Sequence, residues 1–213
     1  MRSMTRILLV VAAVAVLPAA AACEKKVSVS IGSTPAASSA SPTPATAGMK
    51  SYTNFDYGFG IRYPARLKKA AASSVAVSAG ADAVFEVVFV DPATASGGAT
   101  GRDLIKVSVY KLAQPIIGEH LPQFKAELEQ ALSEAQASDP SLQFTPLEPV
   151  IINGVPGYSS EMTMTVDGRT LDSITYFLVS GDYEYQLILQ STENKWSANR
   201  PDFEKAAQTF TVQ

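Results

Sequence analysis

The sequence predicts an α+β fold, in which an antiparallel β-sheet packs against two helices. Three observations predict it. Segments that alternate apolar and polar residues fill the second half of the chain, two-residue turn signals separate them, and one long amphipathic segment at 120–137 interrupts the pattern. Strands in runs with helices inserted between them are typical of an antiparallel sheet with its helices on one side.

The first predicted strands form a hairpin followed by two longer runs. Residues 50–64, KSYTNFDYGFGIRYP, predict two short strands with a turn at the Asp-Tyr-Gly sequence, and Pro64 closes the second because proline cannot continue a central strand. VFEVVFV (84–90) and LIKVSVYKL (104–112) predict two more strands, joined by the loop at 91–102.

Two helices are predicted from spacing and capping residues. In the long one, apolar residues recur at intervals of three and four and Asp139-Pro140 ends the helix; they are Leu121, Phe124, Leu128, Ala131, Leu132 and Ala135. The second is short, with Asn199 as its N-cap and Pro201 in its first turn. It ends in Thr-Phe-Thr-Val, a last turn or an edge strand.

A three-stranded antiparallel meander is predicted for the second half. A strand ending at Asn153-Gly154 leads into a strictly alternating run at 158–166, and the Asp-Gly dipeptide after it favours a type I′ turn. The runs at 170–179 and 183–190 follow, with a turn at Ser-Gly-Asp between them. The last strand places Tyr183, Tyr185, Leu187 and Leu189 on one face.

The first 22 residues are typical of a secretory signal peptide, because two arginines precede an eleven-residue apolar run and a stretch of alanines. The run is too short to span a bilayer as a helix. Ala20-Ala21-Ala22-Cys23 resembles the bacterial lipobox, whose cysteine takes a diacylglycerol. Cys23 is therefore expected to carry lipid; the alternatives are a thiol that merely follows a cleaved leader, or a small buried residue.

Residues 23–48 have the composition of a flexible tether, rich in Ser, Thr, Ala and Pro. As a coil the tether would span about 25–30 Å, and glycosylation of a mucin-like segment would stiffen it. Residues 49–213 then form a single domain. Of the 17 Lys and Arg residues the leader holds two, so the mature chain has 15 basic against 20 acidic residues. This balance argues against nucleic acid as a partner, and the lipid is expected to provide the membrane attachment.

Several short motifs occur in the order found in one known family. They are FGIRYP (59–64), the long helix, ING with PGY (152–158), YEYQLIL (183–189), Trp196 and the final TFTV (209–212). Residues 49–213 thus resemble the PsbP/DcrB-like α/β sandwich family, in its LpqN-type form found in bacterial lipoproteins. The resemblance implies a secreted or lipid-anchored domain without catalytic activity that assists a membrane-associated complex, as the plant member assists photosystem II.

Catalytic and metal-binding signatures are scarce. The single histidine, His120, stands at the start of the long helix with no Gly-x-Ser-x-Gly elbow or cysteine nucleophile, so a helix-terminal surface residue is favoured over a general base. One histidine and one lipid-committed cysteine leave no ligand set for zinc, haem or iron–sulfur clusters, and no cofactor is predicted. The loop SGGATGR (96–102) lacks the Gly-Lys-Ser/Thr ending of a phosphate-binding loop and is interpreted as a hairpin tip.

Acidic residues near the meander turns, Asp167, Asp172, Asp182 and Glu184, suggest a calcium site, although no EF-hand pattern accompanies them. Solvated turn residues are the favoured interpretation. Asp172 and Glu184 are expected on adjacent strands; two catalytic acids on facing strands could support a hydrolase, although spacing singles out no pair.

Aromatic residues are the remaining binding candidates. Tyr57, Tyr158, Tyr176, Tyr183 and Tyr185 are predicted to contribute a binding surface where the opening hairpin meets the meander, although most aromatics are expected in the core.

The sequence therefore favours a non-catalytic module, lipid-anchored outside the cytoplasmic membrane, that binds a protein partner in the cell envelope. The alternative is a carrier of a small apolar or lipidic ligand, held in a pocket behind Met162 and Met164. A hydrolase with an unfamiliar carboxylate site is the third hypothesis.

Overall fold

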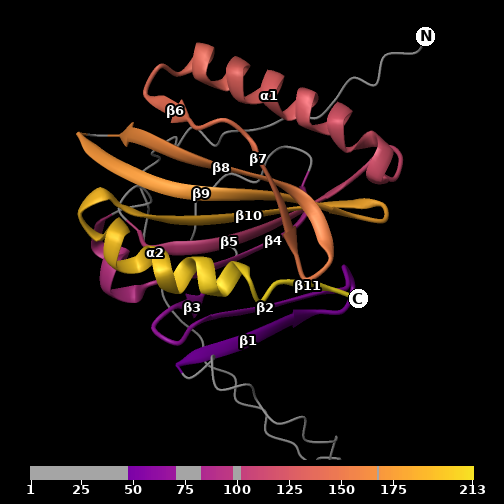
Figure 1. Ribbon diagram of the computed structural model, residues 1–213. Coiled ribbons are helices and arrows are strands. Elements are labelled where there is room, and N and C mark those ends of the chain that lie inside the picture. The colour runs from indigo at the N-terminus through magenta and orange to yellow at the C-terminus, as the bar shows by residue number, and fades with distance from the viewer. Residues whose placement is uncertain (1–47, 71–82, 98–101, 167) are drawn as a thin grey trace, which may run out of the picture.

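The structure, a computed structural model, describes residues 48–70, 83–97, 102–166 and 168–213 (Figure 1). The predicted leader, Cys23, the tether up to residue 47, Asp167 and most of the SGGATGR loop lie outside the described residues. None of the described helices is long and apolar enough to cross a membrane.

The described elements are eleven strands, two α-helices and two 3-10 turns. They are β1 (Met49–Asn54), β2 (Phe59–Pro64), β3 (Lys68–Lys69), β4 (Ala83–Val90), the turn Pro92–Gly97, β5 (Leu104–Lys111), the turn Gly118–His120, α1 (Leu121–Ser138), β6 (Leu142–Phe144), β7 (Glu148–Ile152), β8 (Val155–Val166), β9 (Arg169–Ser180), β10 (Tyr183–Thr192), α2 (Glu193–Ala207) and β11 (Thr211–Val212).

The strands form two antiparallel sheets where the sequence predicted one. The small sheet has the order β1-β2-β11, and the large one has the order β3-β4-β5-β10-β9-β8-β6, with β7 also paired to β8. Each strand that the sequence predicted is present. The short strands β3 and β6 were not predicted, because two or three residues are too few to show an alternating pattern.

Two-residue turns set the register of the meander, as predicted. Val166 pairs with Arg169 and Ser180 pairs with Tyr183, while Ile152 pairs with Val155 across Asn153-Gly154. Asn153 has φ 47° and Gly154 has φ 85°, the left-handed values that a type I′ turn requires.

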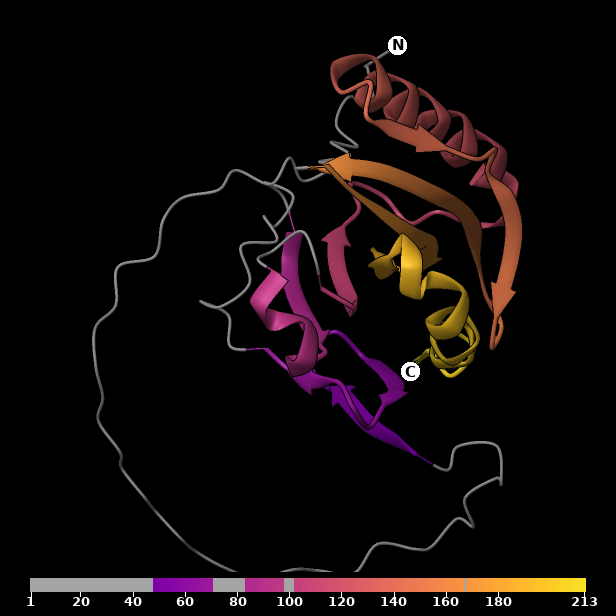
Figure 2. The same ribbon diagram turned by 90° about the vertical axis from the view of Figure 1, so that its left-hand side faces the viewer.

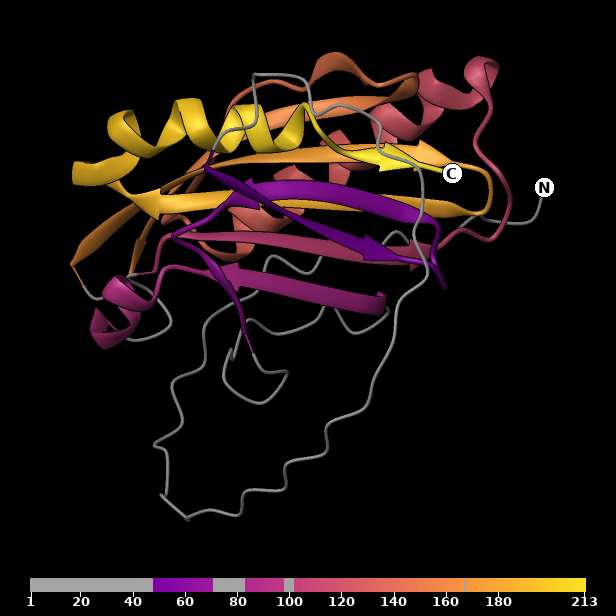
Figure 3. The same ribbon diagram turned by 90° about the horizontal axis from the view of Figure 1, so that it is seen from below.

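The helices lie on opposite faces of the large sheet, so the prediction that both lie on one side is wrong (Figure 2). The small sheet and α2 lie side by side over one face (Figure 3), and α1 covers the other over β8 and β9. The reason lies in β9, which buries both of its faces: Tyr176 and Leu178 point toward α2, whereas Phe177 and Val179 point toward α1.

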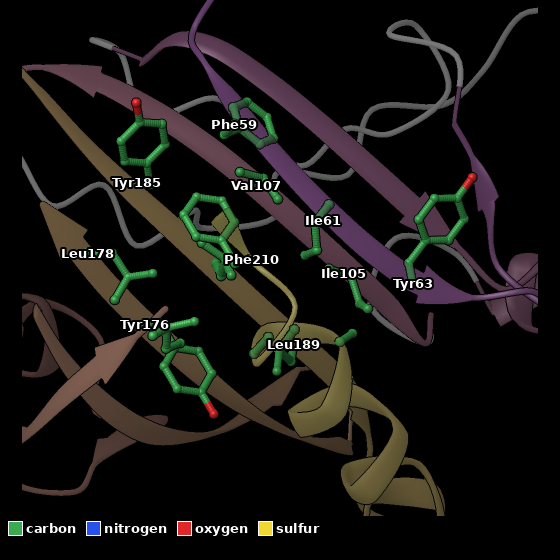
Figure 4. Close-up of a cluster of buried hydrophobic side chains, with 14 of the residues drawn as sticks. Phe59, Ile61, Tyr63, Ile105, Val107, Tyr176, Leu178, Tyr185, Leu189 and Phe210 are labelled. Carbon is green, nitrogen blue, oxygen red and sulfur yellow. The ribbon is translucent and has the colours of Figure 1, made fainter. Parts of the chain in front are cut away.

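The main core fills the space between the two sheets (Figure 4). Phe59 of β2 packs against Tyr185 of β10 and against Phe210, which follows α2, with ring centroids 6.0 and 5.8 Å apart. All three side chains are at most 1 % exposed. The cluster holds the small sheet, α2 and the meander together as one unit.

Helix α2 begins at Glu193, six residues before the predicted N-cap, and Pro201 lies inside it. Asn199 is not a cap. Its side-chain oxygen accepts a hydrogen bond from Arg66 (2.9 Å) and its amide donates one to Ser191 Oγ (3.0 Å), which in turn donates to Asp103 (2.7 Å). Asn199 thus joins α2 to Arg66 directly and to Asp103 through Ser191, whereas local sequence shows only its capping preference.

Gly157 in β8 lies against the backbone of β9 with no room for a side chain. A Cβ built on it would lie 2.0 Å from the Phe177 carbonyl oxygen of β9, so no side chain fits without moving one of the strands.

We expect Gly157→Ala to lower the free energy of unfolding by about 3 kcal/mol, because the added methyl group overlaps a backbone oxygen. Urea unfolding followed by circular dichroism measures the change. Gly118→Ala is the matched control, since nothing lies within 4 Å of a Cβ added there. Equal stabilities of the two variants would contradict the proposed contact.

Candidate functional site

Several turns and chain ends meet at one end of the domain, here called the distal end. It carries the turns at residues 55–58, 153–154 and 181–182, and the C-terminal Gln213, whose N–H donates to Gly58 O (2.8 Å). Asn153 connects two of these segments, because its side-chain amide donates to Gln208 O and Phe210 O. The described chain begins at the opposite end, where Gly48 accepts a hydrogen bond from Ala65 N–H.

The predicted tyrosines divide among three places. Tyr57, Tyr183 and Tyr185 meet at the distal end: the rings of Tyr57 and Tyr183 are 5.7 Å apart edge to face, and the Tyr185 hydroxyl donates to Tyr57 O (2.9 Å). Tyr185 is only 1 % exposed, so it serves the core. The remaining two, Tyr158 and Tyr176, lie on opposite faces of the large sheet.

Tyr176 lies on the face of β9 that α2 covers, beside Glu204, Arg200 and Glu161. Arg200 forms a bidentate ion pair with Glu161 of β8 and bonds Glu204 through Nε. Burial, followed by the charge of Glu204, raises the pKa of Tyr176 to about 12. Tyr176 therefore remains a neutral hydroxyl beneath the helix, where a partner would not reach it.

An apolar groove of about 270 Å³ lies between the start of α1 and the hairpin β7–β8. Its lining residues come from both elements: Leu121, Pro149, Val150, Ile151, Pro156, Gly157 and Tyr158. The Tyr158 hydroxyl donates to Leu121 O (3.1 Å), which fixes the helix start against β8. Tyr158 is thus the one predicted binding tyrosine that lines the groove.

Four large hydrophobic side chains of the described residues are exposed, and all belong to the distal end. Phe55 in the first turn is 85 % exposed, Ile151 in β7 is 71 % and Ile117, four residues before Leu121, is 54 %. The fourth is Val84, whose carbonyl accepts from the Tyr57 hydroxyl. An exposed group of apolar residues on a folded domain is typical of an interaction site.

Sequence reasoning missed the groove residues other than Tyr158. The available signals were the apolar residues of the Pro-Val-Ile-Ile run before the Asn-Gly turn and of the Pro-Ile-Ile run before the long helix. Both had an ordinary interpretation as core, and only the structure places β7 at the edge of the sheet.

The carboxylates proposed for a hydrolase are far apart. Asp172 pairs with Ser191 and Glu184 pairs with Val179, so they lie seven register positions, about 23 Å, apart. Asp172 accepts a hydrogen bond from Thr163 (2.9 Å). Within the described residues, no three His, Cys, Asp or Glu side chains gather as metal ligands. Asp182 lies in the turn between β9 and β10, and Glu184 lies in β10 two residues later.

His120 occupies the N-cap position of α1, as the sequence predicted, without a side-chain cap bond. Its Nε2 lies 3.8 Å from a carboxylate oxygen of Glu119.

Met162 and Met164 are the residues behind which the alternative hypothesis of a ligand carrier places a pocket. Both methionines pack in a small cluster with Leu142, Leu171 and Phe144. The groove described above is at the other end of β8.

Glu184 is buried, and its carboxylate accepts a hydrogen bond from the Gln186 side-chain amide (2.7 Å). Burial raises the pKa of Glu184 to about 7, and the bond from Gln186 lowers it in part. The neighbouring strands β4 and β5 carry further polar side chains on the same face. Lys106 forms an ion pair with Glu86, and the Ser108 hydroxyl donates a hydrogen bond to Glu86.

No protein-family model and no curated protein sequence matches this chain. Solved structures do match its fold. The domain has a PsbP/DcrB-like α+β fold, as the sequence motifs implied. Cyanobacterial PsbP (CyanoP) from Synechocystis sp. PCC 6803 is similar with a TM-score of 0.56 and 15% identity, over 82% of this chain and 98% of that one.

Two further structures share this fold. LpqN, which is involved in cell envelope biogenesis of Mycobacterium tuberculosis, is similar with a TM-score of 0.52 and 13% identity, over 78% of this chain and 90% of that one. PA94 from Pseudomonas aeruginosa, a protein of unknown function, has a TM-score of 0.50 and 16% identity, over 78% and 97% of the two chains. At these identities the likeness concerns the fold alone.

We expect Glu184→Gln to stabilise the protein at alkaline pH. Because the folded pKa lies above the ordinary value of 4.5, folding favours the protonated acid, and the native state loses stability as the pH rises from about 4.5 through about 7. Glutamine carries no such penalty, so the variant should be more stable by about 3 kcal/mol at about pH 8 and by less than about 1 kcal/mol at about pH 5. Urea unfolding at both values measures this. Glu134→Gln, on the exposed face of α1, is the control, and a pH-independent effect of Glu184→Gln would contradict the raised pKa.

Proposed function

We propose that this chain is a lipid-anchored, non-catalytic module of the cell envelope that binds a protein partner through the groove between α1 and β7–β8. The observation that carries the proposal is the position of the groove: it is apolar, it lies at the distal end, exposed Ile151 lines it, and exposed Ile117 comes four residues before the lining residue Leu121. LpqN, a neighbour in fold, is described as an envelope biogenesis protein, which supports the same setting for this chain.

The size of the groove favours a protein partner over a carried ligand. Small-molecule sites usually enclose about 300–1,000 Å³ and cover most of the ligand. At about 270 Å³ and open to solvent, this groove accommodates one or two apolar side chains of a larger partner. A tether to the membrane would raise the effective concentration of such a partner, so a weak contact would suffice.

Cross-linking in the cell tests the proposed surface. Ile151 or Ile117 is replaced in the full-length chain by the photoreactive residue benzoylphenylalanine, and irradiated membranes are analysed for adducts. We expect the same discrete protein adduct from both positions, because Ile151 lines the groove and Ile117 comes four residues before the lining residue Leu121.

The same replacement at Glu134, an exposed position on the far half of α1, is the control and should give no such adduct. Identical adducts from Glu134, or none from either isoleucine, would show that the groove is not the binding surface.

Lipid attachment is tested separately at Cys23. Cells grown with labelled palmitate should incorporate the label into the wild-type chain and not into Cys23→Ser, because Cys23 is the only thiol in the sequence. Triton X-114 partition of both chains gives a second readout. Label that persists in Cys23→Ser, or a wild-type chain without label, would contradict the predicted anchor.

A further inference from the structure

The charge around the groove limits the kind of partner that it can bind. Glu148 is exposed next to the lining residue Pro149, and Glu119, whose side chain is 75 % exposed, comes two residues before Leu121. Within two residues of any lining residue, Glu119 and Glu148 are the only Asp, Glu, Lys or Arg residues of the sequence, so the charge beside the groove is acidic.

The edge strand β7 offers few backbone groups to a partner. Ile152 and Val155 flank a two-residue turn, so Ile152, Val150 and Glu148 direct their backbone groups toward β8. Pro149 and Ile151 face outward, and proline has no N–H. A partner that added a strand here would find a single donor within β7, at Ile151, so its own side chains must supply most of the contact.

The groove is less suited to binding the surface of a bilayer than to binding a protein. Anionic headgroups attract basic residues and repel acidic ones. The described chain starts at Gly48, and β1 runs six residues, about 20 Å, from there to the distal end. The groove thus lies across the domain from the point where the chain leads toward Cys23.

We propose that the groove binds a short protein segment in which apolar side chains enter between Leu121 and Ile151, and adjacent lysine or arginine residues pair with Glu119 and Glu148. This inference rests on the proposed function and adds the chemistry of the partner. Exposed ion pairs contribute little affinity individually, so here they select the partner and speed its association, while the apolar contact holds it.

Selection from a display library of random short peptides on the immobilised full-length chain tests the proposal. We expect enrichment of peptides with an apolar centre and basic flanks. Ile151→Ser should reduce the capture of these peptides about tenfold, because it removes apolar contact in the groove. Phe55→Ser is the matched control, since Phe55 is exposed at the distal end outside the groove lining.

Charge reversal separates recognition from a structural effect. The double variant Glu119→Lys and Glu148→Lys should enrich acidic flanks in place of basic ones, whereas Glu134→Lys should leave the preference unchanged. No enrichment, neutral or acidic flanks on the wild-type chain, or a preference that Ile151→Ser leaves intact would each overturn the proposal. A cross-linked adduct at Ile151 together with any of these results would preserve the proposed function and reject only the basic, apolar partner.

Discussion

Strand β8 contributes to both the core and the groove, and at Gly157 it lies against β9 with no room for a side chain. β8 pairs with β9 along one edge and with both β6 and β7 along the other, and α1 and α2 pack over its opposite faces. Because Gly157 has no Cβ, the strand stays paired up to Leu178 and holds Tyr158 against the start of α1. The core and the groove are thus both built on the same strand.

The distal end combines a rigid frame with an exposed apolar surface. Tyr57, Phe85 and Tyr183 pack ring against ring, and the Tyr185 hydroxyl fixes the backbone of the first turn. Tyr57, Tyr183 and Tyr185 thus belong to the main core or pack against it. Of the tyrosines that first suggested a binding surface, only Tyr158 lines the groove, beside apolar residues of β7, β8 and α1.

The charged side chains inside the domain have different surroundings from those on its surface. Buried Asp103 accepts a hydrogen bond from Ser191 and lies 3.8 Å from Lys195, and Glu86 pairs with Lys106, so these charges have partners. Glu184 accepts a hydrogen bond from the neutral Gln186 amide, and burial raises its pKa toward the neutral acid. Glu119 and Glu148 remain in water, where their interactions are long-range, sensitive to salt and suited to selecting a partner.

The sequence by itself determined the hairpins, the meander and α1, because alternation, Asn-Gly and Asp-Gly turns and three-to-four spacing are local properties of the chain. It also predicted the family resemblance and the acidic balance. Tertiary contacts set the start of α2 and the division of the strands into two sheets. They also place the two helices on opposite faces of the large sheet and form the groove. Asn199, Gly157 and Ile151 each have their role through residues far away in the sequence, and periodicity carries no information about which distant strand or helix will cover a given face.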